Sequence, residues 1–386
     1  MGYYFDHNAT TPVSAEVLAA LVPMLSESFG NASSIHAYGQ AARARVDAAR
    51  EQTAAFFGCG PKEVAFTSGG TEAGNLAVFG VMRLGGAAGK HAITSTIEHP
   101  AVLNACAQLE REGSSVTYLP VDARGRLDPE AVRGALRPET ALVSVMHANN
   151  ETGVVQPVEE IARICRAAGV LFHSDGVQAA GKLPVDVRAL GVDLYSISGH
   201  KLYAPKGVGA LYVREGVKLQ AQQYGGRHER ERRAGTENTA GIVALGTACA
   251  WAARHVAPES ARLTAWRDRL ESAIVERLPL VKVNGGGAPR TPNTLNLSFA
   301  GLDGEALVIA LDLAGFAVST GAACSSGATS PSHVLLAMGL SASQARGSLR
   351  ISLGRLNDET QVEALAAQVV STVEKLRKLS PAHETS

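Results

Sequence analysis

The stretch YSISGHK, residues 195–201, is the part of this sequence that most strongly indicates its fold and chemistry. A short apolar strand is predicted at 194–198, and Lys201 stands in the turn after it. Asp175 takes the same kind of position after a second apolar run, residues 170–173. A lysine and a carboxylate at the ends of two buried strands suit pyridoxal phosphate, which a lysine holds as a Schiff base and whose ring nitrogen needs a carboxylate partner. The alternative for Asp175 is a cap on the turn that follows it.

Helical and short apolar segments alternate outward from this stretch, between about residue 41 and residue 256. Apolar strands are expected at 64–67, 91–95, 140–146, 170–173, 194–198 and 209–213. The alternation predicts an α/β fold with a mostly parallel sheet that helices cover on both faces. Ligands of such sheets bind beyond the carboxyl ends of the strands, where Lys201 and Asp175 are expected.

The pattern changes near residue 258. Fewer strands follow, and they alternate with longer helices, which are expected at 261–278, 304–314 and 358–379. We therefore predict two domains: a large cofactor-binding domain at 15–257, and a smaller α+β domain formed by 1–14 together with 258–386.

Composition excludes several classes of protein. The chain has 386 residues, of which 46% are hydrophobic, and its 36 basic side chains balance 36 acidic ones. This balance gives no sign of a nucleic-acid surface or a basic membrane anchor, and the first residues do not resemble a secretory signal. The five cysteines are scattered and lack CxxC spacing, which argues against disulfides and a metal site and favours a reducing cytoplasm.

Polar residues that could bind a phosphate occur in two turns. In TSGGTE, residues 67–72, Gly70 permits close approach of an anion to the start of a helix, and Thr71 adds a hydroxyl. Ser198 and His200 flank Lys201 and could bind the same group. The alternatives are an ordinary glycine turn and an ordinary surface loop.

Four further side chains are candidates for chemistry. Gln178 lies three residues after Asp175 and could reach the ring oxygen of the cofactor. His99 could stack on a flat ring and move protons, or be a plain loop histidine. Cys324 lies among small residues in an expected exposed loop, which suits a nucleophile, although a surface cysteine without function is the alternative. Arg350, amid apolar strand residues, could bind a substrate carboxylate or form a structural ion pair.

Taken together, these motifs resemble one family, the class-V aminotransferase-like cysteine desulfurases of the NifS/IscS group. The resemblance runs over essentially the whole chain. It is carried by DHNATT (6–11), GNASSIH (30–36), TSGGTE (67–72), EH (98–99), HANNETG (147–153), HSDGVQ (173–178), SGHK (198–201), RAGTEN (233–238), GAACSS (321–326) and RISLGR (350–355). One departure is Gly70, which stands where alanine is common.

The resemblance implies a pyridoxal-phosphate transferase of fold type I with a seven-stranded type of sheet. Lys201 would bind the cofactor, Asp175 would hold its ring nitrogen, and His99 would stack on the ring. Gln178 and Asn149 would lie at the ring oxygen. The residues implied for the phosphate are Gly70, Thr71, Ser198 and His200, with Thr236 reaching the cofactor of the other subunit of a homodimer.

The implied activity is removal of sulfur from L-cysteine, which gives L-alanine and a persulfide on Cys324. Arg350, with help from Asn8, would bind the substrate carboxylate. The sulfur would pass to acceptor proteins such as an iron–sulfur scaffold, or toward tRNA thiolation, without direct binding of nucleic acid or membrane. An aminotransferase, a selenocysteine lyase, a cystathionine-type lyase and a non-catalytic sulfur carrier remain as alternatives.

Overall fold

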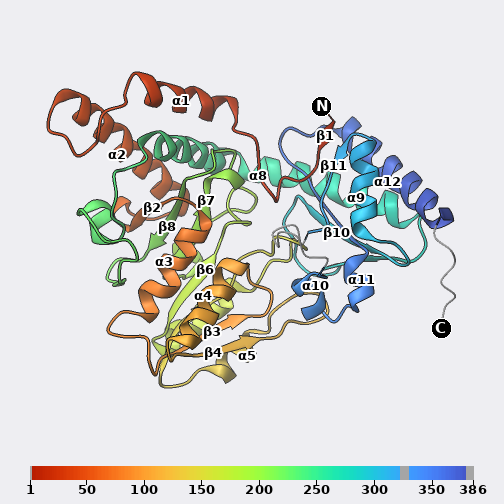
Figure 1. Ribbon diagram of the computed structural model, residues 1–386, viewed down its shortest axis with the longest axis horizontal. Coiled ribbons are helices and arrows are strands. Elements are labelled where there is room, and N and C mark those ends of the chain that lie inside the picture. The colour runs from red at the N-terminus through yellow and green to blue at the C-terminus, as the bar shows by residue number, and fades with distance from the viewer. Residues whose placement is uncertain (1, 322–329, 380–386) are drawn as a thin grey trace.

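A seven-stranded sheet forms the centre of the larger part of the protein (Figure 1). The structure is a computed structural model, which describes residues 2–321 and 330–379. In sheet order the strands are β2 (Val64–Thr67), β8 (Gly209–Val213), β7 (Leu194–Ser198), β6 (Leu171–Asp175), β5 (Thr140–Ser144), β3 (His91–Ser95) and β4 (Ser115–Leu119). Only β8 runs antiparallel to its neighbours. The predicted mostly parallel α/β fold is confirmed.

Helices cover both faces of this sheet, which explains why its strands are almost wholly apolar. On β7, Leu194 packs into a core with α3 and α4, whereas Tyr195 packs into the core of the opposite face. The first face carries α3 (Gly70–Met82) and α4 (Pro100–Arg111). The opposite core includes residues of α1 (Ala15–Ser26), α2 (Ala37–Phe57), α5 (Pro129–Ala135), α6 (Val158–Ala168), α7 (Val187–Leu190) and α8 (Thr239–Val275).

The smaller part has a core of its own. An antiparallel sheet in the order β12-β10-β9 is accompanied by a short parallel pair, β1 with β11. Its strands are β1 (Tyr3–Tyr4), β9 (Val281–Val283), β10 (Thr294–Phe299), β11 (Phe316–Ala317) and β12 (Ser348–Ser352), and its helices are α9 (Gly304–Leu313), α10 (His333–Ala337), α11 (Ala342–Arg346) and α12 (Glu359–Leu379). Phe5 packs in this core, so the N-terminal segment lies with the C-terminal third of the chain.

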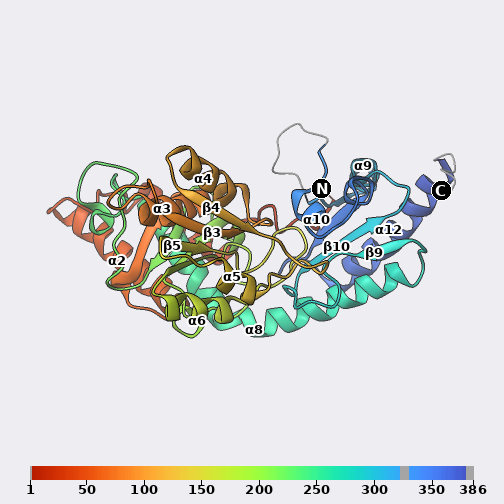
Figure 2. The ribbon, with the colours of Figure 1, turned by 90° about the horizontal axis from the view of Figure 1, so that it is seen from below.

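The helix α8 differs from the prediction. A new helix was expected at 261–278, but α8 continues unbroken from Thr239 to Val275 with Pro258 inside it. Proline removes only one N–H donor, and both halves of α8 are packed: the first half against α1 and α2, the second against α12 and β10. Figure 2 shows α8 running beneath both parts of the molecule. The predicted boundary between residues 257 and 258 lies inside this helix and stays a prediction.

In the described ranges, α8 is the one helix that is long and apolar enough to cross a membrane. More than half of its most apolar window is buried inside the protein, as in a core helix. Three short 3-10 turns complete the structure: η1 (Pro61–Glu63), η2 (Gly199–Lys201) and η3 (His228–Glu231).

Candidate active site

A cavity of about 270 Å³ lies at the carboxyl ends of the parallel strands. The chain reaches it from turns that follow β2, β3, β6 and β7, from the N-terminal segment and from β12. Most of the predicted site residues line it: Asn8, Gly70, Thr71, His99, Asp175, Gln178, Ser198, His200, Lys201 and Arg350. The fold thus brings together residues that are up to several hundred positions apart in the sequence.

Lys201 stands at the end of η2, directly after β7. Its Nζ donates hydrogen bonds to the main-chain oxygens of Asn8 at 2.5 Å and Ala9 at 2.6 Å. The N-terminal segment therefore determines where the amino group of Lys201 lies in the cavity.

Asp175 ends β6 and faces the cavity. Its Oδ1 accepts a hydrogen bond from the main-chain N–H of Val177 at 2.9 Å, so the capping interpretation is also correct. Burial raises the pKa of Asp175, and the neighbouring His99 and Lys201 oppose that rise. The Asp175 carboxylate is shielded from water, so a cation bound next to it would be strongly attracted and would favour its ionised form.

His99 is the N-cap of α4, because its Nδ1 accepts the main-chain N–H of Ala101 at 3.1 Å. Burial lowers the pKa of His99, and Asp175 partly opposes this effect. The neutral ring is thus favoured at neutral pH, and with Nδ1 acting as acceptor its proton lies on Nε2.

The other end of the cavity is suited to an anion. Gly70 begins α3, where the first main-chain N–H groups of a helix have no partner within the helix. Thr71, Ser198 and His200 line the same cavity. Burial, followed by the charge of Lys201, lowers the pKa of His200 to about 4, so this ring contributes a neutral hydrogen-bonding group.

Gly70 is also constrained by its packing. A Cβ atom at this position would lie 2.7 Å from Cγ2 of Val177, which is closer than two carbon atoms approach in proteins. The glycine that departs from the family pattern therefore accompanies the branched side chain of Val177, which packs against it.

Arg350, on β12, is buried and held by two bonds. Its Nη2 pairs with Asp6 Oδ1 at 2.7 Å, and its Nη1 donates to the main-chain oxygen of Asn150 at 3.0 Å. The structural ion pair is therefore present. The buried Nε has no partner in the described residues.

The side chain of Asn8 has no spare hydrogen-bonding capacity. Its Oδ1 accepts from Lys182 and Asn293, each at 3.0 Å. Its Nδ2 donates to Asn150 O at 3.2 Å and to Thr294 Oγ1 at 2.9 Å. A role in substrate binding, which the resemblance implies, would require Asn8 to release one of these partners.

Two of the predicted residues that the structure describes do not line the cavity. Asn149 is fully buried behind it, where its Oδ1 accepts from the main chain of Glu151 and Thr152. Thr236 is exposed on the segment after η3, away from this cavity. Cys324 lies outside the described residues.

Sequence reasoning missed two side chains that organise the site. Asp6 is the ionic partner of Arg350, and Lys182 binds Asn8 and Gln178. Asp6 belongs to a motif that carried the resemblance, so a signal existed. Lys182 lies in an ordinary turn after β6, and nothing in its sequence neighbourhood marks it.

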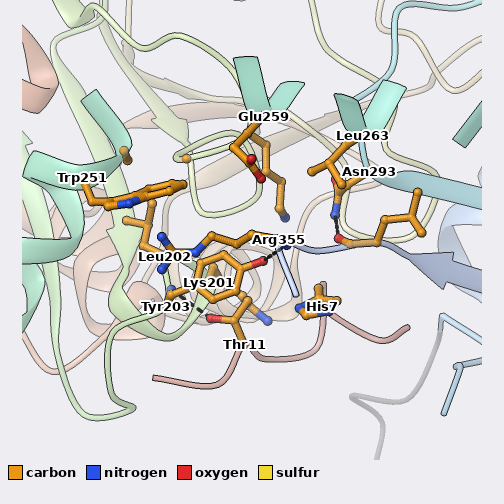
Figure 3. Close-up of a pocket in the computed structure, with 14 residues that line it drawn as sticks. His7, Thr11, Lys201, Leu202, Tyr203, Trp251, Glu259, Leu263, Asn293 and Arg355 are labelled. Atoms are coloured by element: carbon orange, nitrogen blue, oxygen red, sulfur yellow. Dashed lines mark hydrogen bonds between the residues drawn. The ribbon is translucent and has the colours of Figure 1, made fainter. Parts of the chain in front are cut away.

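A second, smaller cavity of about 30 Å³ lies behind Lys201 (Figure 3). His7, Thr11 and Tyr203 line it, and the guanidinium of Arg355 lies 4.0 Å above the Tyr203 ring. Burial lowers the pKa of His7 to about 4. Among the described residues, no group of three or more His, Cys, Asp or Glu side chains is arranged to bind a metal.

Comparison with known proteins agrees with this geometry. Residues 3–365 match the family model "Aminotransferase class-V". Cysteine desulfurase IscS of Anaeromyxobacter sp. (strain Fw109-5) is 52% identical over 99% of this chain and 95% of its own. A solved NifS-like protein superposes with a TM-score of 0.89 at 35% identity, covering 98% of this chain and 100% of that one. A structure described as SspA in complex with cysteine has a TM-score of 0.80 at 37% identity and covers 91% and 98% of the two chains.

Proposed function

Since this chain belongs to the class-V aminotransferase family, we propose that it is a cysteine desulfurase. It removes the sulfur of L-cysteine, releases L-alanine and holds the sulfur as a persulfide on Cys324. The observation that carries this proposal is the convergence of Lys201, Asp175, His99 and Arg350 on one cavity. The cysteine desulfurases that resemble the chain over nearly its full length support the choice of reaction.

The residues present fit pyridoxal phosphate. The helix start at Gly70, with Thr71, Ser198 and His200, provides neutral donors for a phosphate, and the Asp175 carboxylate would hold the ring nitrogen. Lys201 would bind the cofactor, His99 would stack on the ring, Gln178 would reach its oxygen, and Asn149 would support that end from behind. When bound, pyridoxal phosphate withdraws electrons from the Cα of the attached amino acid.

The chain's own residues then bind the substrate and move its protons. Arg350 binds the carboxylate of L-cysteine, because it lines the cavity and its guanidinium keeps N–H donors that Asp6 and Asn150 do not occupy. The Nζ of Lys201, positioned by the main-chain oxygens of Asn8 and Ala9, removes the Cα proton. His99, which lines the cavity, holds a proton at Nε2 because its Nδ1 accepts the Ala101 N–H.

We place the sulfur transfer at Cys324. The described ends of its segment lie beside the site: the main chain of Ser319 pairs with that of Arg350, and the Ser332 hydroxyl donates to Glu151. In the transfer, the Cys324 thiolate forms an S–S bond with the substrate sulfur while the Cβ–S bond breaks. The carbon fragment gains a proton and leaves as L-alanine, so no external oxidant is needed.

We further propose a homodimer in which Thr236 reaches the cofactor phosphate of the second subunit. Leu18, Val22 and Leu25 form an exposed apolar stripe on α1, and Ile35, in the loop before α2, is 91% exposed. The Ser33 hydroxyl contacts His228 at 3.4 Å, which ties this loop to the segment that carries Thr236. A monomeric mass by light scattering would contradict this proposal.

For the cellular role, we propose that the sulfur passes to the thiol of an acceptor protein such as an iron–sulfur scaffold. The cysteines of the described residues, Cys59, Cys106, Cys165 and Cys249, are free, which is typical of the reducing cytoplasm where we expect the enzyme to act.

The test is product analysis with L-cysteine and a reductant. We expect equal amounts of alanine and sulfide from the wild type and neither from Cys324→Ser. Cys59→Ser is the matched control, because burial raises the pKa of the Cys59 thiol to about 12 and makes it a poor nucleophile. Pyruvate and ammonia as products would identify a β-lyase, and full turnover by Cys324→Ser would exclude the persulfide at that position.

A further inference from the structure

Lys182 is a buried lysine next to the active site that the mechanism above does not use. It lies in the turn after β6, and only 8% of the residue is exposed. Its Nζ donates one hydrogen bond to Asn8 Oδ1 at 3.0 Å and one to Gln178 Oε1. Its main-chain oxygen accepts the Ser260 hydroxyl of α8, which fixes the backbone from which the side chain extends.

The surroundings of this amino group do not favour a charge. Both acceptors are neutral amide oxygens, and in the described parts of the chain no carboxylate pairs with Lys182. Burial, and after it the cations Lys201 and Arg350, lower the pKa of Lys182 well below its usual value. A neutral amine has two N–H donors, which equals the number of acceptors present.

Other ionisable groups face this region without neutralising it. Glu259 lines the same small cavity (Figure 3), but its carboxylate pairs with Arg262 at 2.7 Å. His7 and His200 are also close, and burial lowers the pKa of each to about 4, so both are neutral at pH 7. Lys182 is therefore surrounded by neutral imidazole rings, by the cations Lys201 and Arg350, and by a carboxylate that is already paired.

The two acceptors of Lys182 belong to the site itself. With its Oε1 turned to Lys182, Gln178 directs its Nε2 to the main-chain oxygen of Asn8 at 3.0 Å. The same Asn8 oxygen accepts from the Nζ of Lys201 at 2.5 Å. A continuous set of hydrogen bonds thus leads from Lys182 through Asn8 and Gln178 to Lys201.

We propose that Lys182 is a positioning residue: its two N–H donors fix the side-chain amides of Asn8 and Gln178, and through Asn8 they hold the amino group of Lys201 where it reacts. This inference rests on Lys201 as the cofactor lysine, which is part of the proposed function. It predicts that Lys182 acts as an uncharged donor, so that neither an apolar side chain nor a permanent cation can replace it.

The experiment follows cofactor capture rather than turnover. Apoprotein is mixed with pyridoxal phosphate, the visible absorbance is recorded over time and over pH, and borohydride fixation with peptide mapping identifies the modified lysine. Lys182→Met keeps the length of the side chain and removes the donors. Lys90→Met is the matched control, since Lys90 also donates two hydrogen bonds, to the main-chain oxygens of Met82 and Leu84, away from the cavity.

We expect capture by Lys182→Met to be about tenfold slower than by the wild type and Lys90→Met, because Lys201 is no longer held in place. Lys182→Arg adds a permanent positive charge near Lys201, and this charge disfavours a second proton there. The pH midpoint of the absorbance change should therefore fall by about half a unit or more. Lost packing alone would not produce this shift. This variant also serves as the test if Lys182→Met does not fold.

Two results would overturn the inference. The first is capture by Lys182→Met at the wild-type rate. The second is a midpoint that rises in Lys182→Met and stays unchanged in Lys182→Arg, because Lys182 would then be an ammonium ion in the wild type. If the wild type itself captures no cofactor on Lys201, the proposed function fails and this inference fails with it.

Discussion

The two walls of the active-site cavity are built in different ways. On the sheet wall, Asp175 ends β6 and Lys201 ends the turn that follows β7, and the N–H of the nearby Val177 fixes the Asp175 carboxylate. On the wall formed by the N-terminal segment and β12, the bonds are long-range: Asn8 binds a residue 142 positions away, and Asp6 pairs with Arg350 344 positions away. The difference teaches that local strand geometry sets the backbone positions at the cofactor end, where only the Lys201 amino group also depends on the N-terminal segment, whereas the substrate end depends on how distant segments meet.

The largest effect is expected on the long-range wall. Arg350→Lys should lower kcat/KM for L-cysteine about 100-fold, mainly through KM, because an ammonium cannot keep the bonds to Asp6 and Asn150 and still bind a carboxylate. Steady-state alanine formation measures this. Arg267→Lys is the control, since Arg267 is also buried and paired but lies outside the cavity. An equal loss in both variants would mean that Arg350 is only structural.

A smaller effect is expected on the sheet wall. Gly70→Ala should weaken pyridoxal phosphate binding about tenfold, because the new methyl group meets Val177 and displaces the start of α3. Equilibrium titration of apoprotein gives the affinity. The double variant Gly70→Ala with Val177→Ala relieves the contact and should recover most of the loss. If the double variant binds no better than Gly70→Ala alone, the packing explanation is wrong.

The smallest effect concerns Glu98, whose carboxylate joins the end of β3 to the residues that follow β5. Its Oε1 accepts from the Ser95 hydroxyl and the Met146 N–H, while its buried Oε2 has no partner in the described residues. Burial raises the pKa of Glu98 to about 8. The protonated form is therefore favoured in the folded state, and the stability that it contributes is lost as the pH rises from about 4.5 to about 8.

Glu98→Gln keeps the acceptor and cannot ionise. We expect its melting temperature to match the wild type near pH 5 and to exceed it by about 2 °C or more at pH 8, measured by circular dichroism. Glu112→Gln provides the control, because its carboxylate is only partly buried and is paired with Arg83. If the difference in melting temperature between Glu98→Gln and the wild type does not grow with pH, the pKa of Glu98 is not raised in the folded protein.

The sequence was sufficient for the sheet wall. Apolar runs predicted the strands, polar residues at their ends predicted Asp175, His99 and Lys201 near one another, and the structure brings these residues to one cavity. The α/β fold and the family are confirmed. Prediction was less complete where packing overrides local signals: the helix α8 passes through Pro258, and the side chains of Asn8 and Asn149 are occupied by protein partners. The roles of the individual site residues stay predictions until the variants are measured.

By itself, the sequence determined which segments are buried, which turns carry the reactive groups and which family the chain resembles, because hydrophobic period and turn chemistry act over a few residues. Only the tertiary structure decided that Asp6 pairs with Arg350 and that Lys182 binds Asn8 and Gln178. The contacts of Arg350 with Asp6 and of Lys182 with Asn8 join segments that are far apart in the sequence and lie together only in the folded chain. The protonation of a buried amine such as Lys182 depends on the solvent and charges that folding removes from it or brings to it, and no local pattern encodes that environment.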